Sequence, residues 1–413
     1  MAEPGPVCVI SHSHADFSKG GGEVAAQHQV ETLRATGRRT FLVAGSQLAT
    51  SYAEQRPLPA LIPHGADTWL YGFRGMAEDR LAWTDAAARA ALVSHLAGLD
   101  VGIYHFHHYW RVGLDLMVEL MEARPDARFV LTLHEMLAIC LNHGQMVKTG
   151  GRELCREEGP MRCLACFPDQ TPARFRLRKA TLLSVLRRFD AVLCPSDFLR
   201  ARYQAWGLDP ARLSVLENYL GDGAFARPRD PAAGVARAAR FGFFGQPTPF
   251  KGLDVLLRAL PLALRARPDI SLMVHGAERE DVLRLFPALE ATIDAAGPAL
   301  SFAGRYDASE AVGLMQGVGW VIVPSIWWEN SPVVIQEARR AGTPLIVSDI
   351  GGMAEKAPHG VDGLHARRSD PADFARTMVE AAAPDTRRRL GESLRDSIPR
   401  ADFLDGLAQA YGD

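Results

Sequence analysis

The sequence has little of what would place the protein in several special classes. Six cysteines among 413 residues are too few for a disulfide scaffold. No run of about 18 uninterrupted apolar residues occurs, and the opening MAEPGPVCVISHSHADF lacks a basic segment followed by an apolar stretch. A formal net charge of -2 leaves no basic footprint for nucleic acid. We therefore expect a cytoplasmic protein that does not span a membrane and does not bind nucleic acid.

Short apolar, β-rich runs alternate with amphipathic helical stretches along the chain. Examples are VCVIS, TFLVAG and FVLTLHE in the first half, and FGFFG, SLMVHG and PLIVSD in the second. This alternation predicts βαβ units with parallel sheets, and hence an α/β fold. A hydrophobic fraction of 47% and a charged fraction of 23% agree with a globular protein that has large cores.

The length of 413 residues is too great for one ordinary core, so we expect two large domains. Residues 220–239, rich in Gly, Pro, Ala and charge, separate two series of strands. We predict an N-terminal domain over residues 1–219, a connection over 220–239 and a C-terminal domain over 240–395. Residues 396–413 have the pattern of a helix that can pack back on the N-terminal domain. Two doubly wound domains in series leave a cleft at the carboxyl ends of their strands, where such sheets bind ligands.

Two acids stand eight residues apart in the stretch PSIWWENSPVVIQEARRAG. We expect Asn330 or Ser331 to cap a helix whose first residue is Pro332. Glu329 then lies on the loop after a strand, and Glu337 lies about one and a half turns into the helix. Both can face a ligand whose phosphates occupy the helix N-terminus, and can accept hydrogen bonds from hydroxyls of a sugar and a ribose. On spacing alone, two unrelated surface acids are the simpler explanation.

Two other segments could approach the same ligand. In FGFFGQPTPFKGLDVLLRAL, Gly245 ends a strand, and Lys251 with Gly252 opens a helix, so that the lysine can reach phosphates. In SKGGGEVAAQ, three glycines stand just before a helix, where backbone can approach a ligand without Cβ obstruction. A glycine triplet alone is weak support for a binding site.

Together these segments resemble the retaining, nucleotide-sugar-dependent glycosyltransferases of family four, the group 1 glycosyl transferases. Their fold is GT-B, in which two Rossmann-like, doubly wound domains face a central cleft. The motifs run in order along most of the chain. They are the glycine triplet at residues 20–22, TLHE at 132–135, the Lys-Gly pair at 251–252, the Glu-x7-Glu pair at 329 and 337, and GTPLIVSDIGGMAE at 342–355.

The resemblance implies roles for individual residues. Glu337 would hold the ribose hydroxyls, Glu329 would contact hydroxyls of the sugar, and Lys251 would neutralise the leaving diphosphate. His134 would lie beside the sugar, so that the catalytic set is His134, Glu329 and Lys251. The implied donor-binding residues are Gly21, Gly22, Gly245, Gln246, Lys251, Arg305, Asn330, Ser331, Pro332, Val333, Val334 and Glu337.

The implied reaction transfers a sugar, with retention, from a nucleoside-diphosphate sugar to a hydroxyl of a saccharide or lipid-linked acceptor, in polysaccharide or glycoconjugate biosynthesis. The departing phosphate would take the acceptor's proton on the same face. Because no Asp-x-Asp motif occurs, we expect catalysis without a metal cofactor. The family usually carries an arginine where this chain has Gln246, and either Arg305 or a neutral amide would have to serve instead.

The N-terminal half, which the resemblance makes the acceptor-binding domain, carries histidines at two predicted strand ends, in SHSHADF and IYHFHHYWRVG. His105 and His107 share one side of a strand, which is compatible with a metal pair, although no third ligand is evident. Core packing with hydrogen bonds and a place in the acceptor pocket are the alternatives. The residues expected to contact the acceptor are His12, His14, His107, His108 and Tyr109.

Four cysteines fall in a loop-like insert at about residues 140–170. Their order is Cys140, Cys155, then Cys163 and Cys166 as CLAC. A C-x2-C pair with two nearby cysteines is compatible with a structural zinc site, with an iron–sulfur cluster, or with unligated thiols.

The most basic stretch, between Arg174 and Arg188, has apolar residues at helical spacing. A solvated helix face explains it, and so does peripheral contact with the inner face of an anionic membrane. Two other classes of function remain open beside the transferase. These are a sugar-nucleotide epimerase of the same fold and a non-catalytic nucleotide-sugar-binding protein, whereas a dinucleotide oxidoreductase lacks its glycine fingerprint and closing acid.

Overall fold

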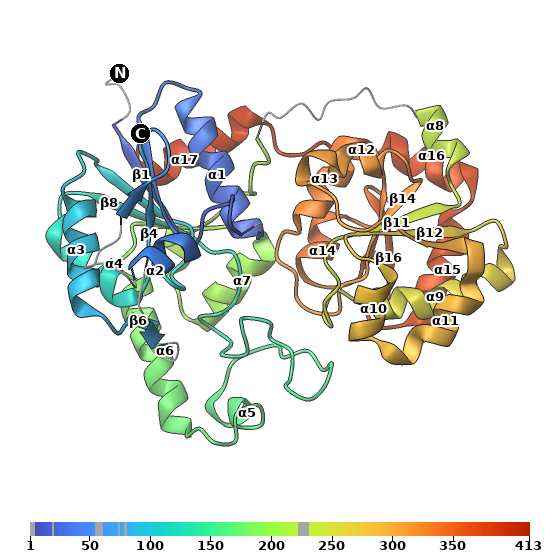
Figure 1. The fold of residues 1–413 in the computed structure, drawn as a ribbon, viewed down its shortest axis with the longest axis horizontal. Helices are drawn as coiled ribbons and strands as arrows, with labels where there is room; N and C mark the ends of the chain where they lie inside the picture. Colours follow the sequence, from blue (N-terminus) through green and yellow to red (C-terminus); the bar gives the residue numbers. More distant parts are fainter. Residues whose placement is uncertain (1–4, 19, 54–60, 73–74, 78–80, 222–230) are drawn as a thin grey trace. The chain divides into compact units, whose positions relative to one another are not determined.

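The computed structural model describes the chain except for residues 1–4, 19, 54–60, 73–74, 78–80 and 222–230 (Figure 1). The described chain divides into two compact units. Unit 1 comprises Met1–Gly221 and Ile398–Asp413, and unit 2 comprises Asp222–Ser397. Part of the predicted connection, residues 222–230, lies outside the described residues. Its remainder contains the helix α8 (Pro231–Ala236), which packs against α16 of unit 2, so that this part is not a simple linker.

Unit 1 is built on an eight-stranded sheet with the order β10-β9-β8-β7-β1-β2-β4-β3. All neighbouring strands are parallel except β3, which pairs antiparallel with β4 at one edge. Its strands are β1 (Val7–Ser11), β2 (Thr40–Gly45), β3 (Leu61–Pro63), β4 (Thr68–Tyr71), β7 (Ile103–Phe106), β8 (Arg128–Thr132), β9 (Ala191–Cys194) and β10 (Leu213–Val215), beside the small pair β5 (Met76–Ala77) and β6 (Ala82–Trp83).

The helices of unit 1 follow the strands in the βα order that the sequence predicts. They are α1 (Gly21–Arg34), α2 (Gln47–Ala53), α3 (Ala86–Ala97), α4 (Leu114–Ala123), α5 (Pro160–Leu164), α6 (Pro172–Leu186), α7 (Asp197–Trp206), η1 (Pro210–Arg212) and α17 (Arg400–Tyr411). The last of these, α17, comes from the end of the chain. Its Phe403, Leu407 and Tyr411 lie in the same buried cluster as Val30 of α1 and Val130 of β8, so this helix completes the core of unit 1.

Unit 2 has a six-stranded, wholly parallel sheet with the order β13-β12-β11-β14-β15-β16. Its strands are β11 (Arg240–Phe244), β12 (Ser271–His275), β13 (Leu300–Phe302), β14 (Trp320–Val323), β15 (Leu345–Ser348) and β16 (Gly363–Ala366). Its helices after α8 are α9 (Leu253–Ala266), α10 (Arg279–Leu285), η2 (Pro287–Leu289), α11 (Glu290–Ala296), η3 (Gly297–Ala299), η4 (Ala308–Glu310), α12 (Ala311–Met315), α13 (Val333–Ala341), α14 (Gly351–Lys356), α15 (Pro371–Ala381) and α16 (Pro384–Glu392).

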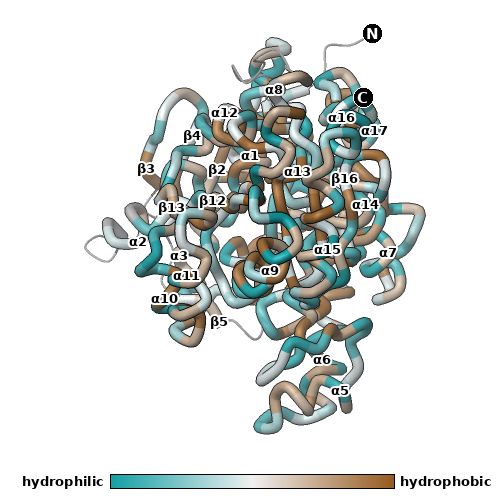
Figure 2. The backbone as a smooth tube through the Cα atoms, turned by 90° about the vertical axis from the view of Figure 1, so that its right-hand side faces the viewer, coloured by the Kyte–Doolittle hydropathy of each residue, from teal (hydrophilic) through white to brown (hydrophobic). Residues whose placement is uncertain are grey.

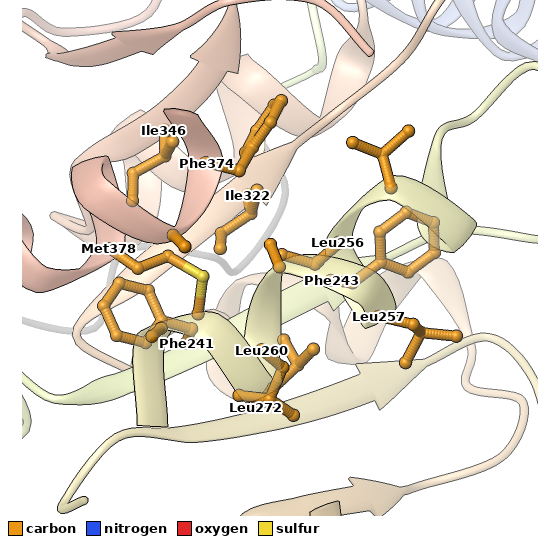
Figure 3. Close-up of a cluster of buried hydrophobic side chains, with 14 of the residues drawn as sticks. Phe241, Phe243, Leu256, Leu257, Leu260, Leu272, Ile322, Ile346, Phe374 and Met378 are labelled. Atoms are coloured by element: carbon orange, nitrogen blue, oxygen red, sulfur yellow. The ribbon is translucent and has the colours of Figure 1, made fainter. Parts of the chain in front are cut away.

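Helices cover both faces of the unit 2 sheet. On one face, Phe241, Phe243 and Ile322 of the strands pack against Leu260 of α9 and Met378 of α15 (Figure 3). The hydropathy colouring of Figure 2 shows hydrophobic stretches along α9. On the other face, α12, α13 and α14 cover a second buried cluster. Parallel strands that are buried on both faces read as near-continuous apolar runs, which is why the sequence identifies them readily.

Helix starts differ from the prediction at two positions that matter for the site. Helix α13 begins at Val333 with Pro332 in the cap position, and no side chain caps it, so the predicted cap at Asn330 or Ser331 is wrong. Helix α1 begins at Gly21, with Gly20 as its cap, so two of the three glycines lie in its first turn and not before it. Among the helices that the structure describes, none is both long and apolar enough to cross a membrane.

Candidate functional site

Unit 2 brings Lys251 and Glu329 into contact through a tight turn. Gly252 caps α9 with φ 71°, and a Cβ at this position would lie 1.9 Å from the carbonyl oxygen of Pro324. Only glycine lets the start of α9 approach the end of β14 this closely. The N–H of Ile326 donates to the carbonyl of Phe250 at 2.8 Å, which fixes the two loops together. As a result, Lys251 Nζ lies 2.6 Å from Glu329 Oε1.

Glu329 is held from several sides. Its Oε1 also accepts hydrogen bonds from Ser325 Oγ and Trp327 Nε1, both at 2.9 Å, and the residue is 7% exposed. The backbone N–H of Gly352 donates to its carbonyl at 2.8 Å, so the predicted GTPLIVSDIGGMAE segment supports the acid directly. Ser325 and Trp327 were not predicted to take part in the site. The only signal for these two residues in the sequence is that each lies within four residues of Glu329.

The start of α13 follows four residues after Glu329. Its first-turn N–H groups, including those of Val333 and Val334, have no acceptor within the helix and suit an anion. The hydroxyl oxygen of Ser331 is buried and has no hydrogen-bond partner among the described residues. An unpaired buried hydroxyl is costly, so this group is available to a ligand at the same helix start.

Glu337 lies in the second turn of α13 and is half-buried. Burial raises its pKa to about 7, and the charge of Arg340 opposes that rise only in part. Burial raises the pKa of Tyr306, and the charge of Glu337 adds to that rise, so the two side chains interact. Tyr306 was not predicted to belong to the site. It directly follows Arg305, a predicted donor-binding residue that is exposed on the loop after β13.

Unit 1 contains a buried chain of hydrogen-bonded histidines. His107 Nδ1 lies 3.1 Å from His134 Nε2, and His107 Nε2 lies 3.0 Å from Gln29 Oε1 of α1. Gln29 Nε2 in turn lies 2.8 Å from His105 Nδ1 and 3.0 Å from the hydroxyl of Tyr411 in α17. The chain therefore joins β7, the end of β8, α1 and the C-terminal helix.

Burial lowers the pKa of both His105 and His134 to about 3, and that of His107 well below its ordinary value, so these rings are neutral at pH 7. The Gln29 carbonyl can only accept, so His107 carries its proton on Nε2 and accepts at Nδ1. His134 then donates from Nε2. The protein thus selects one tautomer of His134, the residue predicted to lie beside the sugar.

Two acids contact other histidines of unit 1. Burial opposes ionisation of Glu23, but hydrogen bonds from His12 and Ser18 outweigh it and lower the pKa of Glu23 to about 2. Glu135 lies 3.2 Å from His108 Nε2 and accepts from the hydroxyl of Tyr109 at 3.2 Å. A Cβ on Gly22 would lie 3.2 Å from His134 Cδ2, so this glycine allows the start of α1 to approach the histidine.

The predicted acceptor-binding residues are thus gathered in unit 1, but they are buried and have partners within it. His107 is 2% exposed and Tyr109 is 1% exposed. For His105 and His107, hydrogen bonds to protein groups occupy the ring nitrogens, as the core alternative expects. A different group has metal-like geometry, because ligand atoms of His14, Asp16 and His64 all lie within 4.8 Å of one another. This group was not predicted.

Two models of known protein families match the chain. Residues 20–219 match a model described as a glycosyl transferase 4-like domain, and residues 238–383 match one described as glycosyl transferases group 1. The chain belongs to the group 1 glycosyl transferases. Within this family, a D-inositol 3-phosphate glycosyltransferase of a Nocardioides species is 31% identical over 194 residues, 42% of each chain. Glycogen synthase of Mycobacterium tuberculosis is 26% identical over 242 residues, 55% of each chain. The chain spans about half the length of the curated relatives it matches.

Several solved structures have a similar fold. HepE of Anabaena, crystallised with UDP and glucose, has a TM-score of 0.65 at 16% identity and covers 99% of this chain and 100% of its own. Sucrose-phosphate synthase of Thermosynechococcus elongatus has a TM-score of 0.64 at 15% identity, covering 99% of this chain and 98% of its own. The fold of this group 1 chain is GT-B, with two Rossmann-like units, as the sequence predicts.

Proposed function

We propose that the protein is a retaining glycosyltransferase that moves a sugar from a nucleoside-diphosphate sugar to a hydroxyl of a saccharide or lipid-linked acceptor. The observation that carries the proposal is the Lys251–Glu329 pair, four residues before the start of α13. A cation beside unpaired helix N–H groups suits a diphosphate, and a fixed carboxylate suits sugar hydroxyls. Family membership supports this assignment, as does UDP in the similar HepE structure.

In the proposed complex, Glu337 accepts hydrogen bonds from the ribose, and the N–H groups of Val333 and Val334 hold the diphosphate together with Ser331. Lys251 neutralises the charge that develops on the leaving phosphate. Gln246 is exposed after β11, and Arg305 remains the proposed replacement cation. No Asp-x-Asp motif is present, so we expect transfer to continue when magnesium is removed.

The chemistry follows from how Glu329 is held. Its Oε1 already accepts from a cation and two neutral donors, so the acid positions the sugar and does not attack it. The bond between the anomeric carbon and the phosphate oxygen breaks, and a bond to the acceptor oxygen forms on the same face. The acceptor's hydroxyl proton passes to the departing phosphate. His134, in its fixed tautomer, would contact the sugar.

Donor binding to unit 2 provides the test. Thermal unfolding is measured with a panel of nucleoside diphosphates and nucleotide sugars, for wild type and Glu337→Gln, since a ligand that binds only the folded state raises stability. We expect one donor to stabilise wild type and to stabilise Glu337→Gln much less. The absence of any shift in folded protein would contradict the proposal. Isomerisation of the donor without acceptor would identify an epimerase instead.

The pKa of Glu337 gives this test a pH signature. The group has a raised pKa of about 7 in the folded protein, so raising the pH from 6 to 8 converts it to the carboxylate that accepts ribose hydroxyls. Binding of a nucleotide sugar, which does not titrate in this range, should therefore tighten as pH rises. The matched Glu337→Gln variant should show no such trend. Titration calorimetry across this pH range measures both.

We propose a cytoplasmic role in polysaccharide or glycoconjugate assembly. We also propose that the stretch between Arg174 and Arg188 makes peripheral contact with the inner face of the membrane. Four basic residues of α6 and the turn after it have partners within unit 1. Arg178 donates to the carbonyls of Leu137 and Ala138, Lys179 pairs with Glu158, Arg187 donates to the carbonyl of Gly207, and Arg188 pairs with Glu122. Arg176 is exposed and would make the contact.

A further inference from the structure

The second half of the segment between β8 and α6 has no hydrophobic core of its own. From residue 148 to residue 172, all of which the structure describes, no hydrophobic side chain is buried. Regular structure there amounts to the five-residue α5 and a bridge between Val147 and Leu154. Figure 1 shows the segment as a largely irregular loop that leads to α5 near α6. Segments that cannot bury apolar surface are usually held by covalent or metal links.

Four of the six cysteines lie in or beside this segment, and all four are half-buried and form no disulfide. The other two, Cys8 and Cys194, are fully buried in strands. The thiols of the four lie close enough for their charges to interact. Cys140 interacts in this way with Cys155 and Cys163, and Cys163 also interacts with Cys155 and Cys166.

Backbone groups direct these cysteines. The N–H of Cys155 donates to the carbonyl of Met146 at 2.7 Å. The hydroxyl of Thr149 donates to the carbonyl of Cys166 at 3.1 Å, which joins this part of the loop to the C-x2-C pair. The C-x2-C pair is set by a turn, in which the N–H of Cys166 donates to the carbonyl of Cys163 at 3.0 Å.

We propose that Cys140, Cys155, Cys163 and Cys166 bind one zinc ion that holds this segment together. Each thiol loses its proton and forms one Zn–S bond, so four protons leave and the centre carries two negative charges. Four thiolates fill a tetrahedral site, so the ion has a structural role and no open position for catalysis. The guanidinium groups of Arg178 and Arg202 interact with the charges of Cys140 and Cys155, respectively, and would offset the charge of the centre.

Binding requires the sulfurs to move closer. No three of these described sulfurs lie within 4.8 Å of one another. On one tetrahedral ion with Zn–S bonds of about 2.3 Å, sulfurs are separated by about 3.8 Å. Cys155, Cys163 and Cys166 are half-buried in the part of the segment that has no packed core, so their side chains can rotate toward Cys140.

The ion would also steady the segment that carries His134 and Glu135. The N–H of Cys140 donates to the carbonyl of Met136 at 2.8 Å. The next two carbonyls, of Leu137 and Ala138, accept from Arg178. Loss of the metal should therefore loosen residues on both sides of Cys140, and the proposal does not depend on the proposed activity.

The test is metal analysis of the full chain, purified without a histidine tag, by mass spectrometry. We expect about one zinc ion per chain. Cys155→Ser and Cys163→Ser should each lose most of the zinc. The matched variant Cys194→Ala, which removes a buried cysteine outside the segment, should keep it. His14→Ala should also keep it, since it removes a ligand of the other metal-like group.

A second measurement avoids dependence on the folding of variants. Wild type in which cobalt replaces zinc should give the absorption bands of a tetrahedral tetrathiolate, and X-ray absorption on the zinc form should give only sulfur neighbours at about 2.3 Å. Folded wild type without zinc would overturn the proposal. So would zinc retained by Cys163→Ser, zinc lost in His14→Ala, nitrogen neighbours, or iron with the visible absorption of a cluster.

Discussion

At the scale of single residues, the site of unit 2 depends on a few fixed contacts around one carboxylate. Glu329 Oε1 takes three donors, of which Lys251 is charged and 38% exposed at its side chain. Because the Lys251 end of the pair is exposed, water and salt screen the interaction and keep its net contribution to stability small. In the proposed reaction, its value lies in placing a positive charge before the ligand arrives, which is where electrostatic catalysis gains most.

Replacing Lys251 with methionine should therefore affect turnover far more than folding. We expect a loss of about 100-fold or more in kcat, as for removal of one stabilising group at a developing charge. The change in unfolding free energy should stay within about 1 kcal/mol. Arg265→Met is the matched control, because Arg265 is an exposed cation on α9, the helix that begins just after Lys251. Equal activity of the two variants would contradict the role given to Lys251.

At the scale of elements, α17 joins the C-terminal end of the described chain to the histidine chain of unit 1. The hydroxyl of Tyr411 lies 2.9 Å from His105 Nδ1, and Arg38 pairs with Asp413 just beyond the helix. The orientation of His134 thus depends on a helix more than two hundred residues away in sequence. A change in α17 would reach His134 through the hydrogen bonds of Gln29 and His107.

Tyr411→Phe tests this dependence. The substitution leaves the ring in the core but removes a buried hydroxyl, so Gln29 Nε2 and His105 Nδ1 lose a partner. We expect a decrease of about 1 kcal/mol in unfolding free energy, measured by chemical denaturation. Asp405→Ala, at an exposed position of the same helix, should change stability by less than about 0.5 kcal/mol. An unchanged unfolding free energy for Tyr411→Phe would show that the hydroxyl does not contribute to stability.

The sequence could predict what depends on local pattern. The buried parallel strands and the turn at Lys251 and Gly252 follow from apolar runs and glycine positions, and they are present. The edge strand β3 and the two-residue strands β5 and β6 carry no such runs and were not predicted. The contacts of Trp327 with Glu329 and of Gln29 with two histidines depend on side-chain direction in three dimensions. Spacing along the chain does not encode them.

At the scale of the whole molecule, the two units differ in how their chain is arranged. Unit 2 is one continuous segment with its own buried clusters, whereas unit 1 needs a second segment, residues 398–413, for its core. A fragment of residues 231–397 should therefore unfold cooperatively on heating. A fragment of residues 1–221 should not, unless residues 398–413 are joined to it by a flexible linker. Circular dichroism of the three fragments measures this, and cooperative unfolding of 1–221 alone would contradict it.

This arrangement also sets an order for synthesis on the ribosome. Because α17 follows unit 2 in the chain, the ribosome makes all of unit 2 after the sheet of unit 1 and before the helix that completes its core. At synthesis rates of about 5–20 residues per second, that interval lasts on the order of ten seconds or more. During this time the first-made unit exposes the apolar surface that Phe403 and Leu407 later bury. The unit that emerges first is thus the one that finishes folding last, and chaperones have their longest opportunity there.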